Sequence, residues 1–326
     1  MPCPTLHRWI LTTALAMPVM AFAQESLILY TSQPNTDAQM TVDAFTAAHP
    51  EIKVEWVRDG TTQLMTRLRA EMSAGVSKPD VLLIADSVTM ESLNREGLLH
   101  PYLSPERSQY DSELYHQEGY YYGTKMITTG IAYHTQAPLK PDSWKSLTTS
   151  DYRNQVVMPS PLYSGAALIH LAALTDQAEM GWDYYQQLQN NGATAHGGNG
   201  GVLTAITSGT KPYGVIVDFM AIREAAKGSP IQFVFPEEGV TAVTEPVAIL
   251  KQADNMEAAQ KFVDFLLSAT GQKLVREQGY LPARADIDPP EGFPARSEIK
   301  MIPLDAGKAL DNAESNKQRF SDIFSG

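Results

Sequence analysis

Two periodicities of apolar residues alternate along the chain after residue 26. The segments 27–32 and 80–85 are compact apolar runs typical of buried strands, and 52–57 alternates as a strand with one exposed face. Between them, 37–49 and 61–74 carry apolar residues at helical spacing. The order strand, helix, strand, helix, strand predicts an α/β fold with an open, mainly parallel sheet and helices on both faces.

A second set of strands and helices follows residue 120. Its predicted elements are a helix over 165–174 and strands over 122–135, 154–159, 215–219 and 231–236. The last part of the chain adds a strand over 245–250 and an amphipathic helix over 255–267. With 326 residues, 43% of them hydrophobic, the chain is long enough for two domains of ordinary size.

Polar residues follow each predicted strand of the first set. Ligands of open α/β sheets bind beyond the carboxyl ends of the strands, so these residues are candidates for ligand contact. They are Ser32, Gln33, Arg58, Thr61, Thr62, Asp86 and Ser87. Each one alone is as well explained by a cap on the following helix, and Arg58 by an ion pair with Asp59. Several of them converging on one crevice favour a binding site.

Two helices of the second set begin in loops that contain glycine. One starts at Ser164 and Gly165, and the other starts at Gly200, close to Thr204. Backbone N–H groups at a helix N-terminus and the helix dipole favour an anion. We expect these two starts to face each other across a cleft, with the second helix of the first set contributing a third. The alternative is that the glycines only relieve strain in a tight loop. No lysine follows the last glycine, so the order of a nucleotide-binding P-loop is absent.

Two carboxylates are candidates for holding a cationic group of a ligand. Asp218 directly follows an apolar strand, where a buried carboxylate is costly unless it meets a cation. An ammonium group on the ligand would supply that cation, although Asp218 is equally suited to capping a helix over 219–227. Glu245 is a candidate for the same contact, or a residue of a hinge.

The N-terminus has the pattern of a secretory signal peptide. Arg8 precedes an apolar run over 9–22, shorter than the roughly 20 residues of a membrane span, and small residues on either side of Phe22 predict cleavage after Ala23. Cleavage removes Cys3, the one cysteine of the sequence, so the exported protein depends on its hydrophobic core rather than on disulfides. The formal net charge is −12 and becomes one unit more negative when Arg8 is lost, which makes nucleic acid an unsuitable partner.

The segment 255–284 resembles the C-terminal signature of the family 1 extracellular solute-binding proteins of ABC importers, and 53–71 and 79–99 resemble the N-terminal lobe of that family. The resemblance implies a two-lobe, type II periplasmic-binding-protein fold, with a mixed, mainly parallel sheet in each lobe. The ligand is then held in the interlobe cleft and enclosed by hinge bending. The implied lobes, after a signal peptide over 1–23, are 24–125 with 245–285 and 126–244 with 286–326. The resemblance also implies a periplasmic monomer without catalysis, cofactor or metal, which delivers a small anionic solute to an ABC permease in the inner membrane.

Two stretches, 57–62 and 158–168, resemble the phosphonate and phosphate-ester receptors of this family. The first candidate solute is therefore 2-aminoethylphosphonate, with helix-terminus N–H groups and hydroxyls on the anion and Asp218 or Glu245 on the amine. Hexose-phosphate and ferric-ion receptors are the neighbouring subgroups.

A ferric-ion receptor is the alternative within the family. Such members hold the metal through two adjacent tyrosines after the strand that corresponds to 213–217, where this chain has Asp218 and a phenylalanine. The pair Tyr184 and Tyr185 lies in a segment that matches a helix packed elsewhere in the family. An exported phosphate-ester hydrolase is the alternative from another class, but the sequence lacks the C-x-x-C, H-E-x-x-H and G-x-S-x-G motifs.

Overall fold

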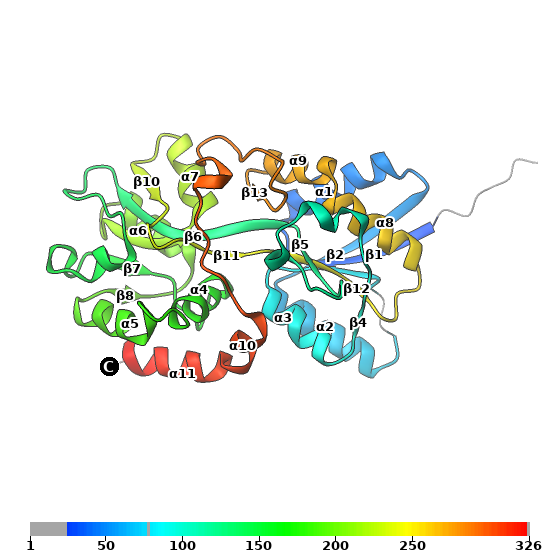
Figure 1. Cartoon of the computed structure of the whole chain (residues 1–326), viewed down its shortest axis with the longest axis horizontal. Helices are drawn as coiled ribbons and strands as arrows, with labels where there is room; N and C mark the ends of the chain where they lie inside the picture. The colour runs from blue at the N-terminus through cyan, green and yellow to red at the C-terminus, as the bar shows by residue number, and fades with distance from the viewer. Residues whose placement is uncertain (1–24, 77–78, 325–326) are drawn as a thin grey trace, which may run out of the picture.

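The computed structural model describes residues 25–76 and 79–324. The predicted signal peptide, its cleavage site and Cys3 lie outside these residues. The described chain forms two lobes that lie side by side, each built around a β-sheet with helices on its faces (Figure 1). The α/β architecture predicted from the sequence is therefore confirmed.

The first sheet, which defines lobe 1, has the strand order β2-β1-β3-β12-β4, with β5 also paired to β12. Its strands are β1 (Glu25–Thr31), β2 (Ile52–Arg58), β3 (Val81–Leu83), β4 (Leu99–His100), β5 (Tyr122–Gly123) and β12 (Pro246–Leu250). Strand β1 runs parallel to β2 and β3, whereas β12 runs antiparallel to β3, β4 and β5.

Helices cover both faces of this sheet. One face carries α1 (Asn35–Ala48), α8 (Met256–Leu267) and α9 (Ala269–Glu277), and the other carries α2 (Thr61–Ser73) and α3 (Ser87–Arg95) (Figure 1). Helix α1 buries Ala38, Val42 and Phe45, whose spacing places them on one side. The Phe45 ring lies 4.9 Å from the Phe262 ring and 5.5 Å from the Phe265 ring of α8. Burying one such side chain stabilises the fold by about 1.5–3 kcal/mol.

The second sheet, which defines lobe 2, has the order β10-β6-β9-β7-β8, with β11 and β13 also paired to β6. Its strands are β6 (Lys125–His134), β7 (Val156–Met158), β8 (Thr194–Ala195), β9 (Tyr213–Val217), β10 (Ile231–Val234), β11 (Thr241–Val243) and β13 (Leu281–Pro282). Its helices are α4 (Gly165–Thr175), α5 (Gly181–Asn190), α6 (Asn199–Thr207), α7 (Asp218–Ala226), α10 (Ala306–Asp311) and α11 (Ala313–Phe324). Short 3-10 turns are η1 (Pro105–Gln109), η2 (Ser112–Leu114), η3 (Trp144–Thr148), η4 (Ser150–Tyr152) and η5 (Arg296–Glu298).

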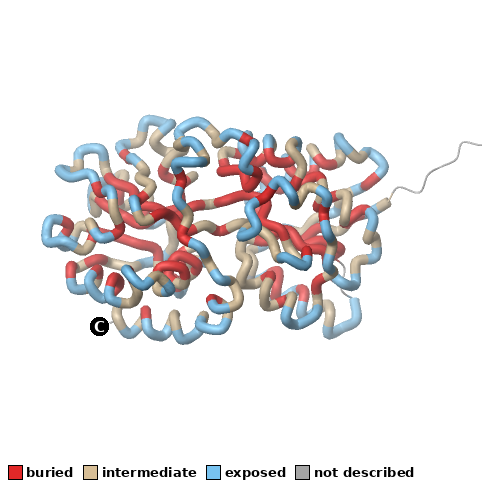
Figure 2. The backbone as a smooth tube through the Cα atoms, in the orientation of Figure 1, coloured by how far each residue is buried: buried red, intermediate tan, exposed pale blue. Residues whose placement is uncertain are grey.

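Two stretches of extended chain cross between the lobes. One consists of β5 and β6, and the other runs from β11 into β12; the two are called the crossing strands here (Figure 1). Figure 2 shows that the crossing strands and both sheets are largely buried, while the exposed residues lie on the outer helices and loops.

Both sheets contain more antiparallel pairs than the sequence pattern predicted, and the crossing strands explain the difference. Strands β1 and β3 end at the edge of lobe 1 that faces lobe 2, whereas β12 enters lobe 1 at that edge and must run the other way. For the same reason β6, which enters lobe 2 from lobe 1, is antiparallel to β9. Among the described residues, no helix has the length and apolar character needed to cross a bilayer.

Candidate ligand site at the crossing strands

In lobe 1, the ends of three neighbouring strands bring the first group of predicted residues together. Thr31 pairs with Arg58 of β2 and with Leu83 of β3, so the residues that follow β1 lie beside both strand ends. The Ser32 N–H donates to the carbonyl of Leu83 over 3.0 Å, and Nε of Arg58 donates to the carbonyl of Gln33 over 2.8 Å. The guanidinium of Arg58 is therefore held at the strand ends but stays exposed.

The start of α2 lies next to this arrangement. The Asp59 carboxylate accepts a hydrogen bond of 2.8 Å from the N–H of Gly60, and within the described chain Arg58 makes no ion pair with it. Thr61 is the first residue of α2 and is partly exposed. The side chain of Thr62 lies outside what the structure describes. The N-cap of α2 is Gly60, which has no side chain to cap the helix, and the Gln63 side chain lies beside it.

Asp86 and Ser87 occupy the start of α3. The Asp86 carboxylate accepts hydrogen bonds from the N–H of Thr89 (2.5 Å) and from its hydroxyl (2.9 Å), so Asp86 is the N-cap of this helix. Burial raises the pKa of the Asp86 carboxyl, and these hydrogen bonds oppose the rise. The capping interpretation explains Asp86 without a ligand.

In lobe 2, Asn199 joins two of the three helix starts on which the anion site was predicted, those of α4 and α6, to the end of β9. Its Nδ2 lies 3.4 Å from the hydroxyl of Ser164, and its Oδ1 accepts a hydrogen bond of 3.1 Å from the N–H of Val217. The Ser164 hydroxyl also accepts from the N–H of Ala167 and caps α4. The starts of α4 and α6 therefore lie next to each other on the same lobe, not opposite each other across a cleft as the sequence suggested. Asn199 itself was missed, although an asparagine in a glycine loop before a helix was its signal.

The glycines of these loops differ in backbone conformation and in how closely other atoms of the chain approach them. Gly197 has φ +55°, a left-handed conformation that favours glycine, and Gly198 lies against the ring of Tyr163. Thr204 sits one turn into α6, exposed, with its hydroxyl bonded to the Gly200 carbonyl (3.1 Å) rather than near the helix start. A Cβ atom would meet nothing within 4 Å at three other glycines, namely Gly165, Gly200 and Gly201. Packing within the chain does not require glycine at those three positions.

Asp218 lies at the junction of β9 and β6 and is fully buried, with a relative exposure of 1%. Its Oδ2 accepts from the backbone N–H (2.9 Å) and the hydroxyl (2.7 Å) of Thr128, and its Oδ1 accepts from the N–H of Phe219 (2.6 Å). Burial raises the pKa of the Asp218 carboxyl to about 6, against the opposing effect of these donors. Three donors of the chain thus offset part of the cost of the charge for which the sequence suggested a ligand cation.

Glu245 lies between the two crossing strands in a buried ion pair that the sequence did not predict. Its Oε2 lies 2.6 Å from Nζ of Lys125 and accepts a hydrogen bond of 3.0 Å from Nε2 of Gln33. The two charged side chains are 1% and 4% exposed. Glu245 has φ +40°, a strained conformation for a residue with a Cβ. Within the described chain, Oε1 of Gln33 and the Ser32 hydroxyl are buried without a hydrogen-bond partner.

A cation–aromatic cluster next to this ion pair links the lobes directly. Two cations lie over the ring of Tyr280. Nζ of Lys125 is 4.1 Å from the ring centroid, and the guanidinium carbon of Arg223 is 4.8 Å from it. Arg223, on α7 of lobe 2, also donates to the carbonyl of Gln278 in lobe 1. The Tyr280 hydroxyl donates to Asp37 over 2.7 Å. The signal for Lys125 was a single cation in an apolar strand, whereas nothing in the pattern indicated Arg223 or Tyr280.

The tyrosine pair of α5 lies in the core of lobe 2. Tyr184 and Tyr185 are both buried, and the Tyr185 ring packs against Phe320 with 5.9 Å between centroids. Burial raises the pKa of both phenols. The pair therefore packs α5 against α11, as expected from the sequence. Among the described residues, no group of three or more His, Cys, Asp or Glu side chains is arranged to hold a metal ion.

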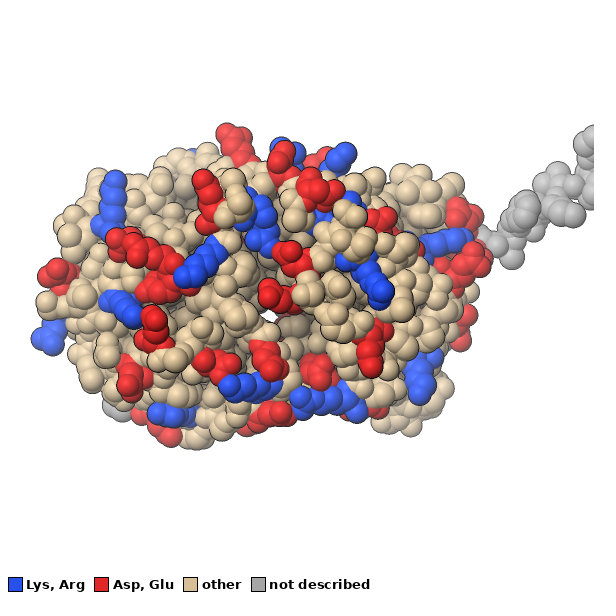
Figure 3. Space-filling view, viewed as in Figure 1, with Lys and Arg blue, Asp and Glu red and all other residues tan. Residues whose placement is uncertain are grey.

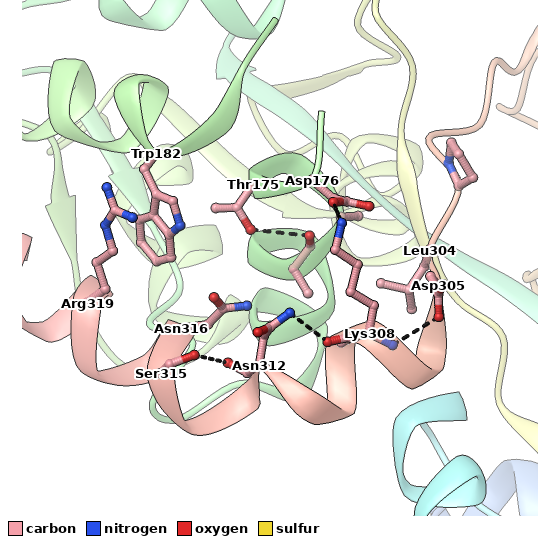
Figure 4. Close-up of a pocket in the computed structure, with 14 residues that line it drawn as sticks. Thr175, Asp176, Trp182, Leu304, Asp305, Lys308, Asn312, Ser315, Asn316 and Arg319 are labelled. Atoms are coloured by element: carbon pink, nitrogen blue, oxygen red, sulfur yellow. Dashed lines mark hydrogen bonds and ion pairs between the residues drawn. The ribbon is translucent and has the colours of Figure 1, made fainter. Parts of the chain in front are cut away.

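A groove of about 330 Å³ lies on lobe 2 between α4, α5 and the two C-terminal helices (Figure 4). The Arg319 guanidinium stacks 4.6 Å from the Trp182 ring, and Lys308 forms an ion pair with Asp176. The described residues that line this groove include none of the predicted ligand residues. The predicted ligand residues lie elsewhere, at the strand ends of lobe 1, at the joined helix starts of lobe 2 and at the crossing strands.

Known proteins share both the sequence pattern and the fold. A family model for bacterial extracellular solute-binding proteins matches residues 77–311. A probable ABC transporter periplasmic-binding protein of Sinorhizobium fredii is 26% identical, over 79% of this chain and 73% of its own. A putative 2-aminoethylphosphonate-binding periplasmic protein of Salmonella typhimurium is 23% identical, over 78% of this chain and 76% of its own length.

Solved structures agree on the fold. The periplasmic binding protein AfuA of Actinobacillus pleuropneumoniae, with fructose 6-phosphate bound, superposes with a TM-score of 0.77 at 20% identity, over 93% of this chain and 99% of that one. Iron-bound HitA of Pseudomonas aeruginosa gives the same TM-score at 22% identity, over 92% of this chain and 99% of the HitA chain. The two-lobe fold, the crossing strands and the family match lead to one conclusion: the chain belongs to the bacterial extracellular solute-binding proteins.

Proposed function

We propose that the chain is the periplasmic solute receptor of an ABC importer and that it captures a small phosphonate or phosphate ester between its lobes. The solute then passes to the permease in the inner membrane. Our first candidate solute is 2-aminoethylphosphonate, the solute in the name of the Salmonella relative. The family consists of solute-binding proteins rather than enzymes, which supports a receptor over an exported hydrolase.

One observation carries the assignment of an anion. The starts of α4 and α6 are joined through Asn199 and Ser164, and glycine stands at Gly165 and Gly200 although the surrounding chain leaves room for a side chain. Free N–H groups at two adjacent helix N-termini suit the tetrahedral oxygens of a phosphonate or phosphate. Glycine at these positions keeps the backbone accessible. The exposed Arg58 in lobe 1 offers a cation to the same group.

The amine of 2-aminoethylphosphonate has weaker support. Asp218 and Glu245, the two predicted acceptors, already bind donors and a lysine of their own chain. A phosphate ester without an amine therefore fits the anion site equally well, and the fructose 6-phosphate in the AfuA structure is an example of that class. Ferric ion is the second candidate because iron-bound HitA shares the fold to the same degree.

We further propose that the lobes comprise 24–125 with 245–285 and 126–244 with 286–326, and that they close by bending at the crossing strands. Strand β13, which pairs with the first two residues of β6 in the second sheet, is then contributed to that sheet by lobe 1. The receptor is proposed to act as a monomer, in keeping with a site formed within one chain.

Substitutions at Gly200 test the anion site, because a side chain there meets open space. Gly200→Asp places a carboxylate at the helix start. For an assumed separation of about 6 Å and an effective dielectric constant of about 40, each negative charge of a bound phosphonate would cost about 1.4 kcal/mol. That cost is about tenfold in affinity. Gly200→Ala is the matched control, since it adds a Cβ without charge.

The measurement is the dissociation constant of each variant for 2-aminoethylphosphonate, glucose 6-phosphate, inorganic phosphate and ferric citrate by calorimetry. We expect at least one phosphorus-containing ligand to bind the wild type, to bind Gly200→Ala with similar affinity and to bind Gly200→Asp at least tenfold more weakly. Equal affinity in both variants would exclude the start of α6 from the site. Binding of ferric citrate alone would replace the phosphonate assignment with the ferric-ion one.

A further inference from the structure

A second cavity of about 330 Å³ lies between the two lobes. Its walls come from three parts of the molecule: Ser87 and Tyr121 of lobe 1, Met126 and Ala242 of the crossing strands, and Leu304 of the segment that follows η5. The space-filling view shows a hollow between the lobes, with acidic side chains at its edge (Figure 3). Its volume is within the range of small-molecule sites, which begins at about 300 Å³.

The cavity lies on the face of the crossing strands opposite to the buried ion pair. Side chains alternate between the two faces of a strand. Met126 lines the cavity, whereas its neighbour Lys125 forms the ion pair with Glu245. Thr244 lines the cavity as well, directly before Glu245. The cavity is therefore distinct from the group around Gln33, and of the predicted solute residues the structure describes, Ser87 is the one that reaches it.

Apolar surface forms much of the wall. Met126 belongs to a small core between the lobes, and Leu114, Ala242 and Met301 pack against that core while remaining partly exposed. These three side chains leave methyl and thioether groups facing the cavity. A ligand with an apolar body would remove this surface from water, at about 25 cal/mol per Å².

Hydroxyl groups supply the polar part of the wall. Ser87, Tyr115 and Thr244 line the cavity, and within the described chain their hydroxyls make no hydrogen bond. Each is able to donate and to accept. They would pair with a hydroxyl or carbonyl group of a ligand.

The described residues of the wall leave no free cation for an anionic ligand. Nη2 of Arg296 lies within 3.4 Å of the Asp111 carboxylate, so these two charges offset each other. Nε of Arg296 is buried and, within the described chain, has no hydrogen-bond partner, so it adds a donor for a ligand hydroxyl or carbonyl oxygen. The remaining lining charge is Glu113, which is exposed and therefore screened by water. This electrostatic environment differs from that of the joined helix starts.

We infer that this cavity is a second ligand site, which takes an uncharged, mainly apolar molecule of about the size of benzyl alcohol that carries a hydroxyl or carbonyl group. Because its walls belong to both lobes and to the strands that join them, a molecule in it stabilises one angle between the lobes. If the proposed function holds, this molecule also raises the affinity for the solute, since holding one side of the crossing strands open favours closure of the other. By linkage, the solute raises the affinity for the second ligand by the same factor.

Benzyl alcohol, benzoate and benzylammonium test the chemistry of the site, because they share a ring and differ in charge. Their binding to the full mature chain is followed by chemical-shift changes of the protein's methionine methyl groups, which include Met126 and Met301. We expect benzyl alcohol to bind at least fivefold more tightly than either ion. Ala242→Phe and, independently, Met301→Trp fill the cavity from two walls and should abolish that binding. Ala178→Phe, at an exposed alanine outside the cavity, is the control that should leave it unchanged.

The outcomes separate this inference from the proposed function. Tighter binding of benzoate or benzylammonium, or binding unaffected by both filling variants, overturns the inference. If benzyl alcohol binds as expected, the solute affinity of the wild type should rise at least threefold in its presence; an unchanged affinity overturns the coupling. If no solute is found at all, the proposed function fails while the benzyl alcohol arm still decides whether the second site exists.

Discussion

Replacing Asp218 by asparagine should change how the stability of the protein depends on pH. The carboxyl is buried and its pKa is raised to about 6 from an ordinary value of 3.8. The folded state therefore holds this proton more tightly than the unfolded state does. In terms of linkage, the cost of burying the charge is absent at low pH, appears as pH rises above about 4 and is complete above pH 6.

The magnitude follows from those two values. Between pH 4.5 and pH 7.0, titration of this one carboxyl lowers the free energy of unfolding by about 2 kcal/mol. The asparagine side chain carries no charge, so the variant lacks this contribution. Its amide also keeps an oxygen acceptor for the two donors of Thr128 and loses an acceptor for the N–H of Phe219, which costs about 1 kcal/mol at any pH.

Urea unfolding of the wild type and Asp218→Asn at pH 4.5, 5.5 and 7.0 measures the effect. The difference between the two proteins isolates Asp218, because other groups titrate in both. His170 is one of them: burial lowers its pKa to about 3, so it removes stability as pH falls below 6.5. We expect the variant to gain about 2 kcal/mol relative to the wild type between pH 4.5 and 7.0. Parallel stability curves would refute the buried, internally bonded carboxylate and reopen its role in binding an amine.

The other predictions concern the contacts that hold the site. Lys125→Met leaves Glu245 buried without a cation and should cost about 3–5 kcal/mol in urea unfolding, whereas Lys125→Met with Glu245→Gln should cost clearly less; equal costs would argue against the pair. Asn199→Ala leaves the Val217 N–H unpaired and should cost about 1–3 kcal/mol while weakening solute binding. Unchanged solute binding in a folded Asn199→Ala protein would remove the joined helix starts from the site.

The order of strands and helices was predictable because it depends on local periodicity. The helix predicted over 61–74 is α2, Thr61–Ser73, and the strand predicted over 52–57 is β2, Ile52–Arg58. The direction of the strands was not predictable from local periodicity. The antiparallel setting of β6 and β12 depends on which lobe the chain leaves and which it enters. That information is contained in the resemblance to the family rather than in the pattern of any segment.

The candidate site shows the same division between local and long-range information. Asp86 and Ser164 cap the helices that follow them, as helix-start residues do. Two of the three donors around Asp218 come from Thr128, ninety residues earlier in the chain, and Glu245 meets Lys125 and Gln33 across more than one hundred residues. Sequence reasoning recognised that each carboxylate needed a partner. It offered a ligand as that partner, beside a helix cap for Asp218 and a hinge position for Glu245, because the crossing strands that supply the partners are brought together only by the fold.

The measurement that tests the central claim most directly is a thermal-shift comparison of the mature wild-type protein with the candidate solutes. A ligand that binds only the folded state, at about 100 times its dissociation constant, adds about 2.7 kcal/mol to the free energy of unfolding. We predict a shift with 2-aminoethylphosphonate or with a hexose phosphate. A shift with ferric citrate alone, or with none of these ligands, would contradict the assignment of the joined helix starts as a site for a phosphorus-containing anion.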